Sequence, residues 1–300
     1  MRHAVALVTA RAARGQDEDM PPLLAAFAAA GAHAEIVDWD DASVDWSRFD
    51  AALLRSAWDY TERLGEFLAW VERAAGRTRL LNPLPVVRWN SDKHYLNALA
   101  EAGVAVVASQ FIEPAEEDPA AVLARFVAAH EAGEFVVKPA VGAGSRDTRR
   151  HRRADLAEML EHMRPLLRAR RAVLIQPYLE SVDREGETAL IYIDGAFSHA
   201  IRKGPLLPPG GAATQALFAA EEITPRVPAE DELALARRIL ASLPFAPLLY
   251  ARVDLIRDGQ GTPRVLELEL TEPSLYFARG PGSAARFAGA ALARVTGPQS

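Results

Sequence analysis

The chain reads YARVDLIRDGQGTPRVLELEL from Tyr250 to Leu270, two strand-like runs separated by a turn at Asp258-Gly259. Glu267 and Glu269 are two residues apart and therefore project from the same face of their strand. A hairpin turn brings Asp254 opposite them. Three carboxylates on one face repel one another unless a cation lies among them. Hard oxygen ligands of this kind suit Mg²⁺ carried by a nucleotide.

The alternative for this hairpin is a solvated sheet face. The residues between the acids argue against it, because they are apolar and predict that the other face of the hairpin is buried. These residues are Val253, Leu255, Leu266, Leu268 and Leu270. We therefore favour a metal site built on the hairpin, with Asp254, Glu267 and Glu269 as its ligands.

Composition excludes several classes of protein. The 300 residues contain no cysteine, which rules out disulfides, thiolate metal sites and cysteine nucleophiles. No apolar run approaches the roughly 18 residues that cross a bilayer, and the start of the chain is too short for a signal peptide. The net charge of −6 argues against a general nucleic-acid binder. We expect a cytoplasmic protein with no membrane or nucleic-acid partner.

Alternating strand and helix signals predict an α/β N-terminal domain over residues 1–89, with a small parallel sheet. Two α+β subdomains are expected to follow, over 90–180 and 181–300. In the first of these, Ser91 is the expected N-cap of a helix and 104–107 an expected strand. The basic run 149–153 is interpreted as a solvated turn, or as part of a lid over phosphates.

The second chemical signal is the strand 135–139, which contains Lys138 and is followed by the small residues Gly142, Gly144 and Ser145. Their backbone N–H groups can approach phosphate oxygens closely. The loop is neither a Walker A motif nor the dinucleotide fingerprint, and taken on its own a plain flexible loop is the favoured interpretation. Lysine itself is informative, since only Lys93, Lys138 and Lys203 occur among 34 basic residues.

A third segment runs from a strand into Gln176, Tyr178, Leu179 and Glu180. Extended backbone at this point offers N–H and C=O groups to an adenine edge. The carboxylates that follow can hold ribose hydroxyls, and the candidates are Glu180, Asp183 and Glu187. Taken alone, this segment is also an ordinary strand end.

In order and spacing these segments resemble the ATP-grasp superfamily, from about Asn90 to Phe277. The resemblance implies an ATP-grasp fold that encloses ATP and Mg²⁺, with Lys93 and Lys138 on the phosphates. It places Gln176–Glu180 at the adenine, and Asp183 or Glu187 at the ribose. It implies three catalytic cations, which are Arg252, Lys203 and Arg202. Glu269 stands where many members have asparagine, which leaves the number of bound metal ions open.

Two segments, 55–60 and 271–277, differ from the common peptide ligases of that superfamily and resemble the O-ureido-serine cyclo-ligases of D-cycloserine biosynthesis. The resemblance implies ATP-dependent activation of a small amino-acid-like carboxylate, followed by ring closure. Arg55 is then a candidate clamp for a carboxylate, Asp59 for an ammonium group, and Ser274 a further substrate contact. For Arg55 and Asp59, an aromatic staple with a surface ion pair is an equal alternative.

Two other functions stay open at this level. An intermolecular ligase that joins an amino acid to an amine needs the same nucleotide site and room for a second substrate. A nucleotide-binding protein without catalysis is disfavoured because the expected phosphate and metal residues occur together. The sequence leaves the oligomeric state open, with a homodimer as one expectation.

Overall fold

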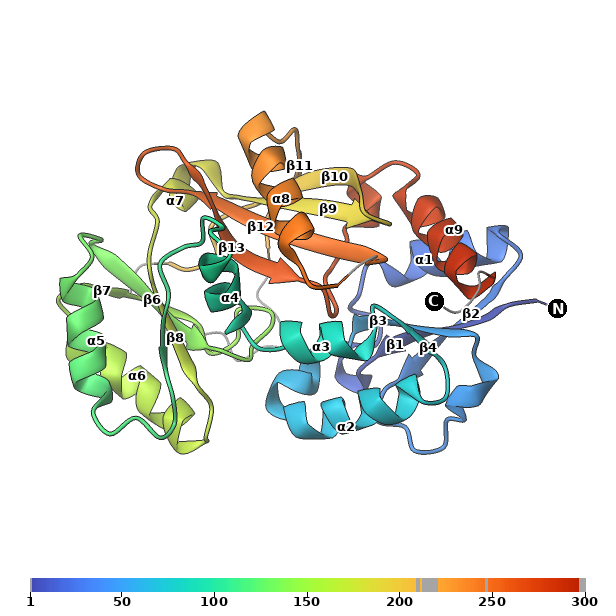
Figure 1. The fold of residues 1–300 in the computed structure, drawn as a ribbon, viewed down its shortest axis with the longest axis horizontal. Helices are drawn as coiled ribbons and strands as arrows, with labels where there is room; N and C mark the ends of the chain where they lie inside the picture. The colour runs from blue at the N-terminus through green and yellow to red at the C-terminus, as the bar shows by residue number, and fades with distance from the viewer. Residues whose placement is uncertain (1, 209–210, 212–220, 246–247, 297–300) are drawn as a thin grey trace.

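The computed structural model describes residues 2–208, 211, 221–245 and 248–296. Within this part of the chain the strands form three sheets that lie side by side (Figure 1). Each sheet falls within one of the three expected ranges, 1–89, 90–180 and 181–300. The fold is therefore the mixed α/β and α+β arrangement that the sequence predicted.

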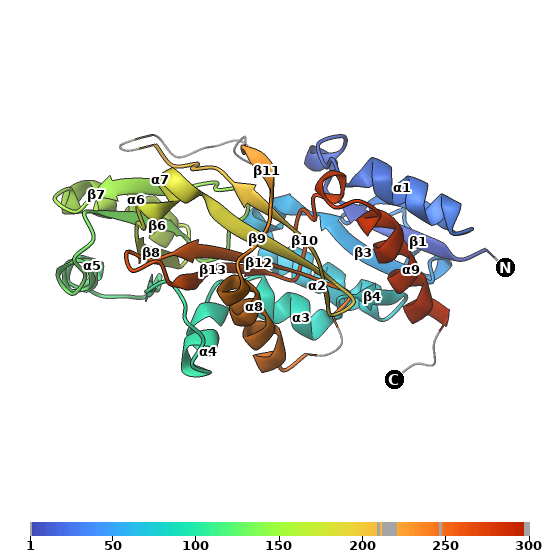
Figure 2. The same cartoon turned by 90° about the horizontal axis from the view of Figure 1, so that it is seen from above.

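The N-terminal sheet is parallel, with strand order β2-β1-β3-β4. Its strands are β1 (Ala4–Thr9), β2 (His33–Asp38), β3 (Ala51–Ser56) and β4 (Arg79–Leu81). Alternate residues of β1 belong to two different apolar clusters, one shared with α1 (Met20–Ala29) and one with α2 (Leu64–Ala75). A sheet buried on both faces explains the continuous apolar strands. The last helix, α9 (Ser283–Thr296), also packs against α1 (Figure 2).

The central sheet is antiparallel, with strand order β5-β8-β6-β7. Its strands are β5 (Gln110–Ile112), β6 (Glu134–Pro139), β7 (Arg149–Arg152) and β8 (Val173–Pro177). Two amphipathic helices, α5 (Pro119–Ala128) and α6 (Leu156–Arg168), bury their apolar sides against one face. The other face is left to line the pocket described below.

The C-terminal sheet is antiparallel, with strand order β11-β10-β9-β12-β13. The strands are β9 (Glu187–Ile193), β10 (Ala196–Lys203), β11 (Ile223–Arg226), β12 (Tyr250–Arg257) and β13 (Pro263–Glu269). Helices α4 (Tyr95–Glu101) and α8 (Glu230–Ser242) cover one face, and the short helix α7 (Ser181–Glu185) precedes β9. The expected hairpin turn at Asp258-Gly259 is present, and a second turn at Asp194-Gly195 joins β9 to β10.

Ser91 is not an N-cap. A helix that the sequence did not reveal, α3 (Leu84–Asn90), ends at Ser91, and the next helix starts only at Tyr95. The prolines at 83 and 85 hid α3, although a proline is well suited to the first turn of a helix. Lys93 therefore lies in the short connection between α3 and α4, where its backbone N–H donates to the carbonyl oxygen of Ala140 at 3.0 Å.

Two further expectations are wrong. The segment 104–107 forms a single bridge, between Val106 and Val265, because the next residue of β13 is the extra residue of a bulge. The run 149–153 is not a solvated turn, since most of it forms β7 and pairs with β6. Arg150 is buried there against Glu134, a burial that charge patterning alone does not reveal.

No helix in the described residues has both the length and the apolar character that a membrane crossing demands.

Candidate active site

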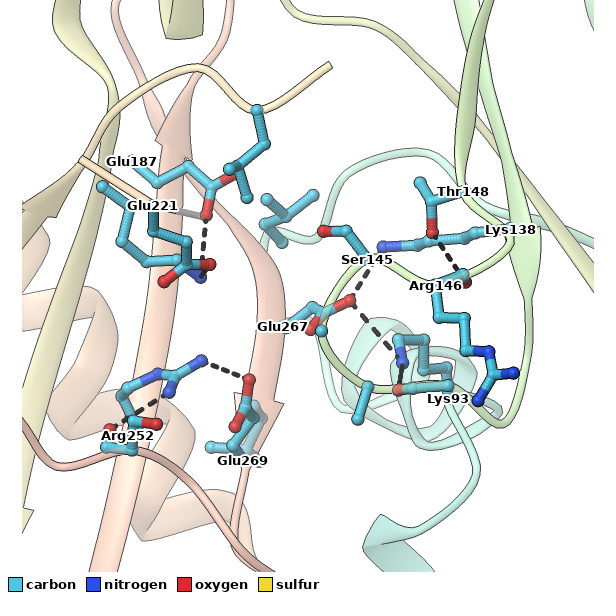
Figure 3. A pocket seen from close by; sticks show the side chains of 18 of the residues that line it. Lys93, Lys138, Ser145, Arg146, Thr148, Glu187, Glu221, Arg252, Glu267 and Glu269 are labelled. Atoms are coloured by element: carbon cyan, nitrogen blue, oxygen red, sulfur yellow. Dashed lines mark hydrogen bonds and ion pairs between the residues drawn. The ribbon is translucent and has the colours of Figure 1, made fainter. Parts of the chain in front are cut away.

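A pocket of about 470 Å³ lies where the three sheets meet, and Figure 3 shows its polar side chains. One wall comes from the central sheet and the loop after β6. The facing wall comes from β9, β10, β12 and β13. The far end is closed by segments 16–19, 58–60 and 271–279, which belong to the N-terminal domain and to the chain after β13.

The hairpin β12–β13 has the expected register, with Asp254 opposite Glu267 and Arg252 opposite Glu269. The register shifts after this point, and Leu255 pairs with Val265. Leu266 is the extra residue of this bulge, so it turns to the pocket instead of joining the core as the alternation predicted. Glu267 and Glu269 line the pocket beside it.

Glu267 is held by two ammonium groups (Figure 3). Its Oε1 accepts a hydrogen bond from Nζ of Lys138 at 2.9 Å and lies 3.7 Å from Nζ of Lys93. Burial alone would raise the pKa of Glu267, but the two ammonium groups outweigh burial and hold the pKa well below its usual range. The three side chains come from β13, β6 and the α3–α4 connection, so this cluster joins the two walls of the pocket.

A second charged cluster surrounds Asp254. Its carboxylate accepts from Nζ of Lys203 at 3.0 Å and from Nε and Nη2 of Arg252, each at 2.8 Å. Burial would raise the pKa of Asp254, yet the two cations outweigh burial and lower it. Lys203 also lies 3.3 Å from Glu187, and the carboxylates keep the pKa of this buried lysine well above its usual value.

The loop after β6 brings Gly142, Gly144 and Ser145 to the pocket. The carbonyl oxygen of Gly142 accepts from Nζ of Lys93 at 2.7 Å. Gly144 and Ser145 both have left-handed backbone, with φ of 61° and 60°. Successive residues of this kind let backbone N–H groups converge, which is the arrangement that cradles anionic oxygens.

The sequence predicted six candidates for the adenine and the ribose between residues 176 and 187. Four of them line the pocket, namely Gln176, Tyr178, Leu179 and Glu187. Glu180 and Asp183 do not. Asp183 is engaged elsewhere, since it accepts from the hydroxyl of Tyr178 at 2.5 Å and from Nη1 of Arg150. The guanidinium of Arg150 also lies over the Tyr178 ring, 3.6 Å from its centroid. Of the three carboxylates, Glu187 is the one that lines the pocket.

The two expected substrate clamps, Arg55 and Asp59, do not line the pocket. Arg55 is the last but one residue of β3 and is completely buried, where it pairs with Asp19 at 3.2 Å. Asp59 turns to the opposite side and accepts from the indole N–H of Trp39 at 2.8 Å. Because β3 continues through Ser56, Arg55 is a strand residue, and its side chain is directed into the protein. Ser274 does line the pocket.

Oxygen ligands for a divalent cation are present, with one change from expectation. Glu267 and Glu269 offer carboxylates to the pocket, whereas Asp254 lies below the surface with both oxygens held by Lys203 and Arg252. Within the described residues, no three acidic or imidazole groups stand ready as a metal site. The donor set still fits Mg²⁺, because two carboxylates on one strand face supply the hard oxygens it prefers. Burial among neighbouring acids raises the pKa of Glu269 to about 8.

A family model for the N-terminal domain of D-cycloserine synthetase DcsG matches residues 5–82. The cycloserine biosynthesis protein DcsG of Streptomyces lavendulae is 44% identical over 296 residues, which span 97% of this chain and 98% of that protein. The chain belongs to the DcsG family. The crystal structure of D-cycloserine synthetase DcsG superposes with a TM-score of 0.92 at 43% identity, over 98% of this chain and 100% of the other.

More distant structures share the fold of this DcsG-family chain. A D-alanine–D-alanine ligase from Bacillus anthracis has a TM-score of 0.68 at 16% identity, over 98% of this chain and 97% of that one. The ATP-grasp ligase PsnB, solved with Mg and ADP, has a TM-score of 0.65 at 18% identity, over 97% and 98%. These structures confirm the prediction of an ATP-grasp fold, and the relation to D-cycloserine synthetase DcsG confirms that of a ligase.

Several pocket residues of this DcsG-family chain escaped the sequence reasoning. They are acids and aromatic residues at the far end, namely Asp17, Asp19, Tyr60, Glu272 and Tyr276. Tyr60, Glu272 and Tyr276 belong to segments 55–60 and 271–277, which are identifiable as unusual from the sequence. The sequence predicted other side chains of these segments as the substrate contacts. Asp17 and Asp19 follow β1, and strand ends of this kind are where α/β sheets bind ligands. Arg202, an expected catalytic cation, lies outside the pocket and donates to the carbonyl oxygen of Glu185.

Proposed function

We propose that this chain is a D-cycloserine synthetase that cyclises O-ureido-D-serine at the cost of one ATP. The observation that supports it most directly is that one pocket has two different ends. The charged end carries Lys93, Lys138, Glu267 and Glu269, and the closed end carries Asp17, Tyr60, Glu272 and Tyr276. One small zwitterion fits such an end. The 44% identity to DcsG over nearly the whole chain supports the same substrate.

The nucleotide is assigned to the charged end. Lys93, Lys138 and the loop 142–145 are the groups for its phosphates, and Gln176–Leu179 with Leu266 enclose its base. Glu187 is the carboxylate for the ribose. Glu267 and Glu269 are the ligands for Mg²⁺, which when bound neutralises phosphate charge. Asp254 then serves a different purpose from a ligand, because it fixes the cations Lys203 and Arg252.

In the proposed reaction the substrate carboxylate attacks the γ-phosphorus, giving an acyl phosphate and ADP. The nitrogen bonded to oxygen then attacks the acyl carbon of the same molecule, and phosphate leaves. Water removes the carbamoyl group, which ends as CO₂ and ammonia. The sum is O-ureido-D-serine, ATP and water to D-cycloserine, ADP, phosphate, CO₂ and ammonia.

The chain supplies charge and position and forms no covalent bond with the substrate. Arg252 lines the pocket between the two ends, and its guanidinium contacts Glu269 and Asp254. This fixed cation is placed to neutralise negative charge that develops on the transferring phosphoryl group. Lys203, buried and held charged by Asp254, adds a second positive charge behind it.

ADP release against a panel of carboxylates tests the proposal. The panel contains O-ureido-D-serine, its L-enantiomer, D-alanine, and pairs of amino acids, with products identified by mass spectrometry. We expect one ADP per D-cycloserine with O-ureido-D-serine alone. ADP release that requires two amino acids and yields a dipeptide would replace the cyclase with an intermolecular ligase. ATP binding with no ADP release on any acid would contradict both.

A further inference from the structure

The chain after β13 wraps around a carboxylate that comes from the N-terminal domain. Asp19 accepts three successive backbone N–H groups, those of Leu275 at 2.5 Å, Tyr276 at 3.1 Å and Phe277 at 2.8 Å. Tyr276 has a φ of 50°, the left-handed conformation that lets neighbouring N–H groups converge. A side chain here occupies the kind of cradle that usually receives an anionic ligand.

Arg55 contacts both Asp19 and the segment that Asp19 holds. Its Nη2 donates to Oδ2 of Asp19 at 3.2 Å and to the carbonyl oxygen of Pro273 at 2.9 Å. Arg55 is fully buried, and its Nε and Nη1 have no hydrogen-bond partner in the part of the chain that the structure describes. Asp19 is therefore its main counter-charge, and a buried ion pair of this kind holds its segments in one geometry.

The pair connects three segments that are distant in the sequence: the start of α1, the end of β3 and the segment 271–277. That segment carries Glu272, Ser274 and Tyr276, which line the closed end of the pocket. By contrast, Lys93, Lys138 and Glu267 are held by one another, and within the described residues none of them forms a hydrogen bond or ion pair with Asp19 or Arg55. Arg252, between the two ends, donates to the carbonyl oxygen of Ser274 in this segment at 3.1 Å. The pair can therefore affect the closed end without contacting the two lysines of the charged end.

We propose that Asp19 and Arg55 are positioning residues, which set segment 271–277 for recognition of the amino-acid substrate and have no part in nucleotide binding. Both oxygens of Asp19 are already used by backbone N–H groups and Arg55, so Asp19 acts through the segment rather than on the substrate. Arg55 is thus a clamp for a carboxylate of its own chain. The kinetic consequence rests on the proposed function, whereas the ordering of the segment does not.

The test is Asp19→Asn, which keeps the shape but places an NH₂ group against backbone N–H donors. We expect the KM for O-ureido-D-serine to rise about tenfold while kcat changes less than about threefold and ATP affinity stays the same. The matched control is Asp38→Asn, which removes another buried carboxylate at a strand end of the same sheet, paired with Arg14 at 2.7 Å. The control should leave both KM values unchanged. An unchanged substrate KM in Asp19→Asn, or an equal rise in the control, overturns the proposal.

Amide hydrogen exchange gives a readout that does not depend on turnover. Peptides covering 271–279 should exchange about tenfold faster in Asp19→Asn than in the wild type or in Asp38→Asn. Equal exchange in all three overturns the positioning role, even if the substrate proves to be another acid. If the wild type is inactive on O-ureido-D-serine but the exchange rates differ as expected, the proposed function fails and the positioning role stands.

The double variant Asp19→Asn/Arg55→Met covers the case in which Asp19→Asn does not fold. It removes the uncompensated guanidinium, so the melting temperature should return towards that of the wild type. The substrate KM should stay raised about tenfold, because the three N–H groups still lack their carboxylate. A double variant that recovers both the melting temperature and the wild-type KM contradicts the proposal.

Discussion

The two ends of the pocket are built in different ways. At the charged end, side chains from separate strands meet one another directly, as Lys138 and Lys93 meet Glu267. At the closed end, backbone groups of the segment 271–277 are held by the buried pair Asp19–Arg55. The difference teaches that the charged end is fixed mainly by direct contacts between side chains, whereas the closed end depends on where the segment 271–277 is held.

The same difference appears in how exposed charge is managed. Lys93 and Lys138 line the pocket and are paired with Glu267. An incoming anion can take the place of this carboxylate as their partner. Arg55 is instead completely buried and does not line the pocket, and it is paired with Asp19. Substitutions at the charged end should therefore act on chemistry and nucleotide, and those at the closed end on substrate affinity.

The largest effect is expected from Lys138→Ala. Loss of this ammonium would remove the proposed phosphate contact and the hydrogen bond to Glu267, so turnover should fall about 10²- to 10³-fold with the fold intact. Steady-state ADP release measures the turnover, and the circular dichroism spectrum shows whether the fold is intact. Arg152→Ala, an exposed cation on the same sheet, is the control and should stay near wild type. Near-normal turnover in Lys138→Ala would contradict the phosphate assignment.

Much of the charged end could be predicted from the sequence because Lys138, Glu267 and Glu269 lie on regular strands. The strand period placed Glu267 and Glu269 on one face, and a hairpin turn placed Asp254 opposite them. One bulge was enough to defeat the same rule at Leu266, since an extra residue reverses the alternation. Asp254 was found in the right register, but its burial beneath Arg252 and Lys203 depends on β10, which the hairpin does not contain.

The closed end could not be predicted in the same way. Segments 55–60 and 271–277 were identified as unusual, yet Arg55 and Asp59 were assigned to the substrate because nothing local tells which way a side chain points at a strand end. The partner of Arg55 lies 36 residues before it, and the backbone it holds lies 218 residues after it. Contacts of this separation follow from tertiary packing and not from any local pattern.

The second largest effect is expected from Glu267→Gln. The amide cannot neutralise Lys93 and Lys138, and it is a weaker ligand for Mg²⁺, so activity should fall about 100-fold at limiting Mg²⁺ and recover in part at high Mg²⁺. A Mg²⁺ titration of ADP release measures this. Glu66→Gln, on an exposed side chain of α2, is the control. An unchanged Mg²⁺ requirement in Glu267→Gln would mean that Glu267 only holds the lysines.

The variant Arg150→Gln tests whether the charged end also depends on a buried residue that positions part of its wall. Arg150 lies over the ring of Tyr178 and pairs with Glu134 and Asp183, so its loss should loosen the wall at the base of the nucleotide. We expect the KM for ATP to rise about five- to tenfold with the substrate KM unchanged. This is the mirror image of Asp19→Asn. A rise in the substrate KM instead would remove the distinction between the two ends.

The smallest expected effect is on the pH dependence of protein stability, and it comes from the histidine pair His151 and His162 beside the loop after β6. His162 donates from Nε2 to the carbonyl oxygen of Asp147, next to the phosphate loop, and its Nδ1 lies 3.1 Å from Nε2 of the buried His151. With Nδ1 of His162 as acceptor, the His162 ring is neutral and His151 donates from Nε2. Burial, together with the charges of His162 and Arg149, lowers the pKa of His151 from 6.5 to about 4.

The unfolded chain therefore binds more protons than the folded chain between these two pH values. The stability that neutral His151 contributes is fully present above pH 6.5 and is lost as the pH falls towards 4. His151→Gln should accordingly show a smaller drop in melting temperature between pH 7 and pH 5 than the wild type, by a few degrees. The exposed His33→Gln should keep the wild-type drop. Identical drops in all three proteins would show that the imidazole pair is not held neutral, and that the loop beside it is stabilised by other contacts.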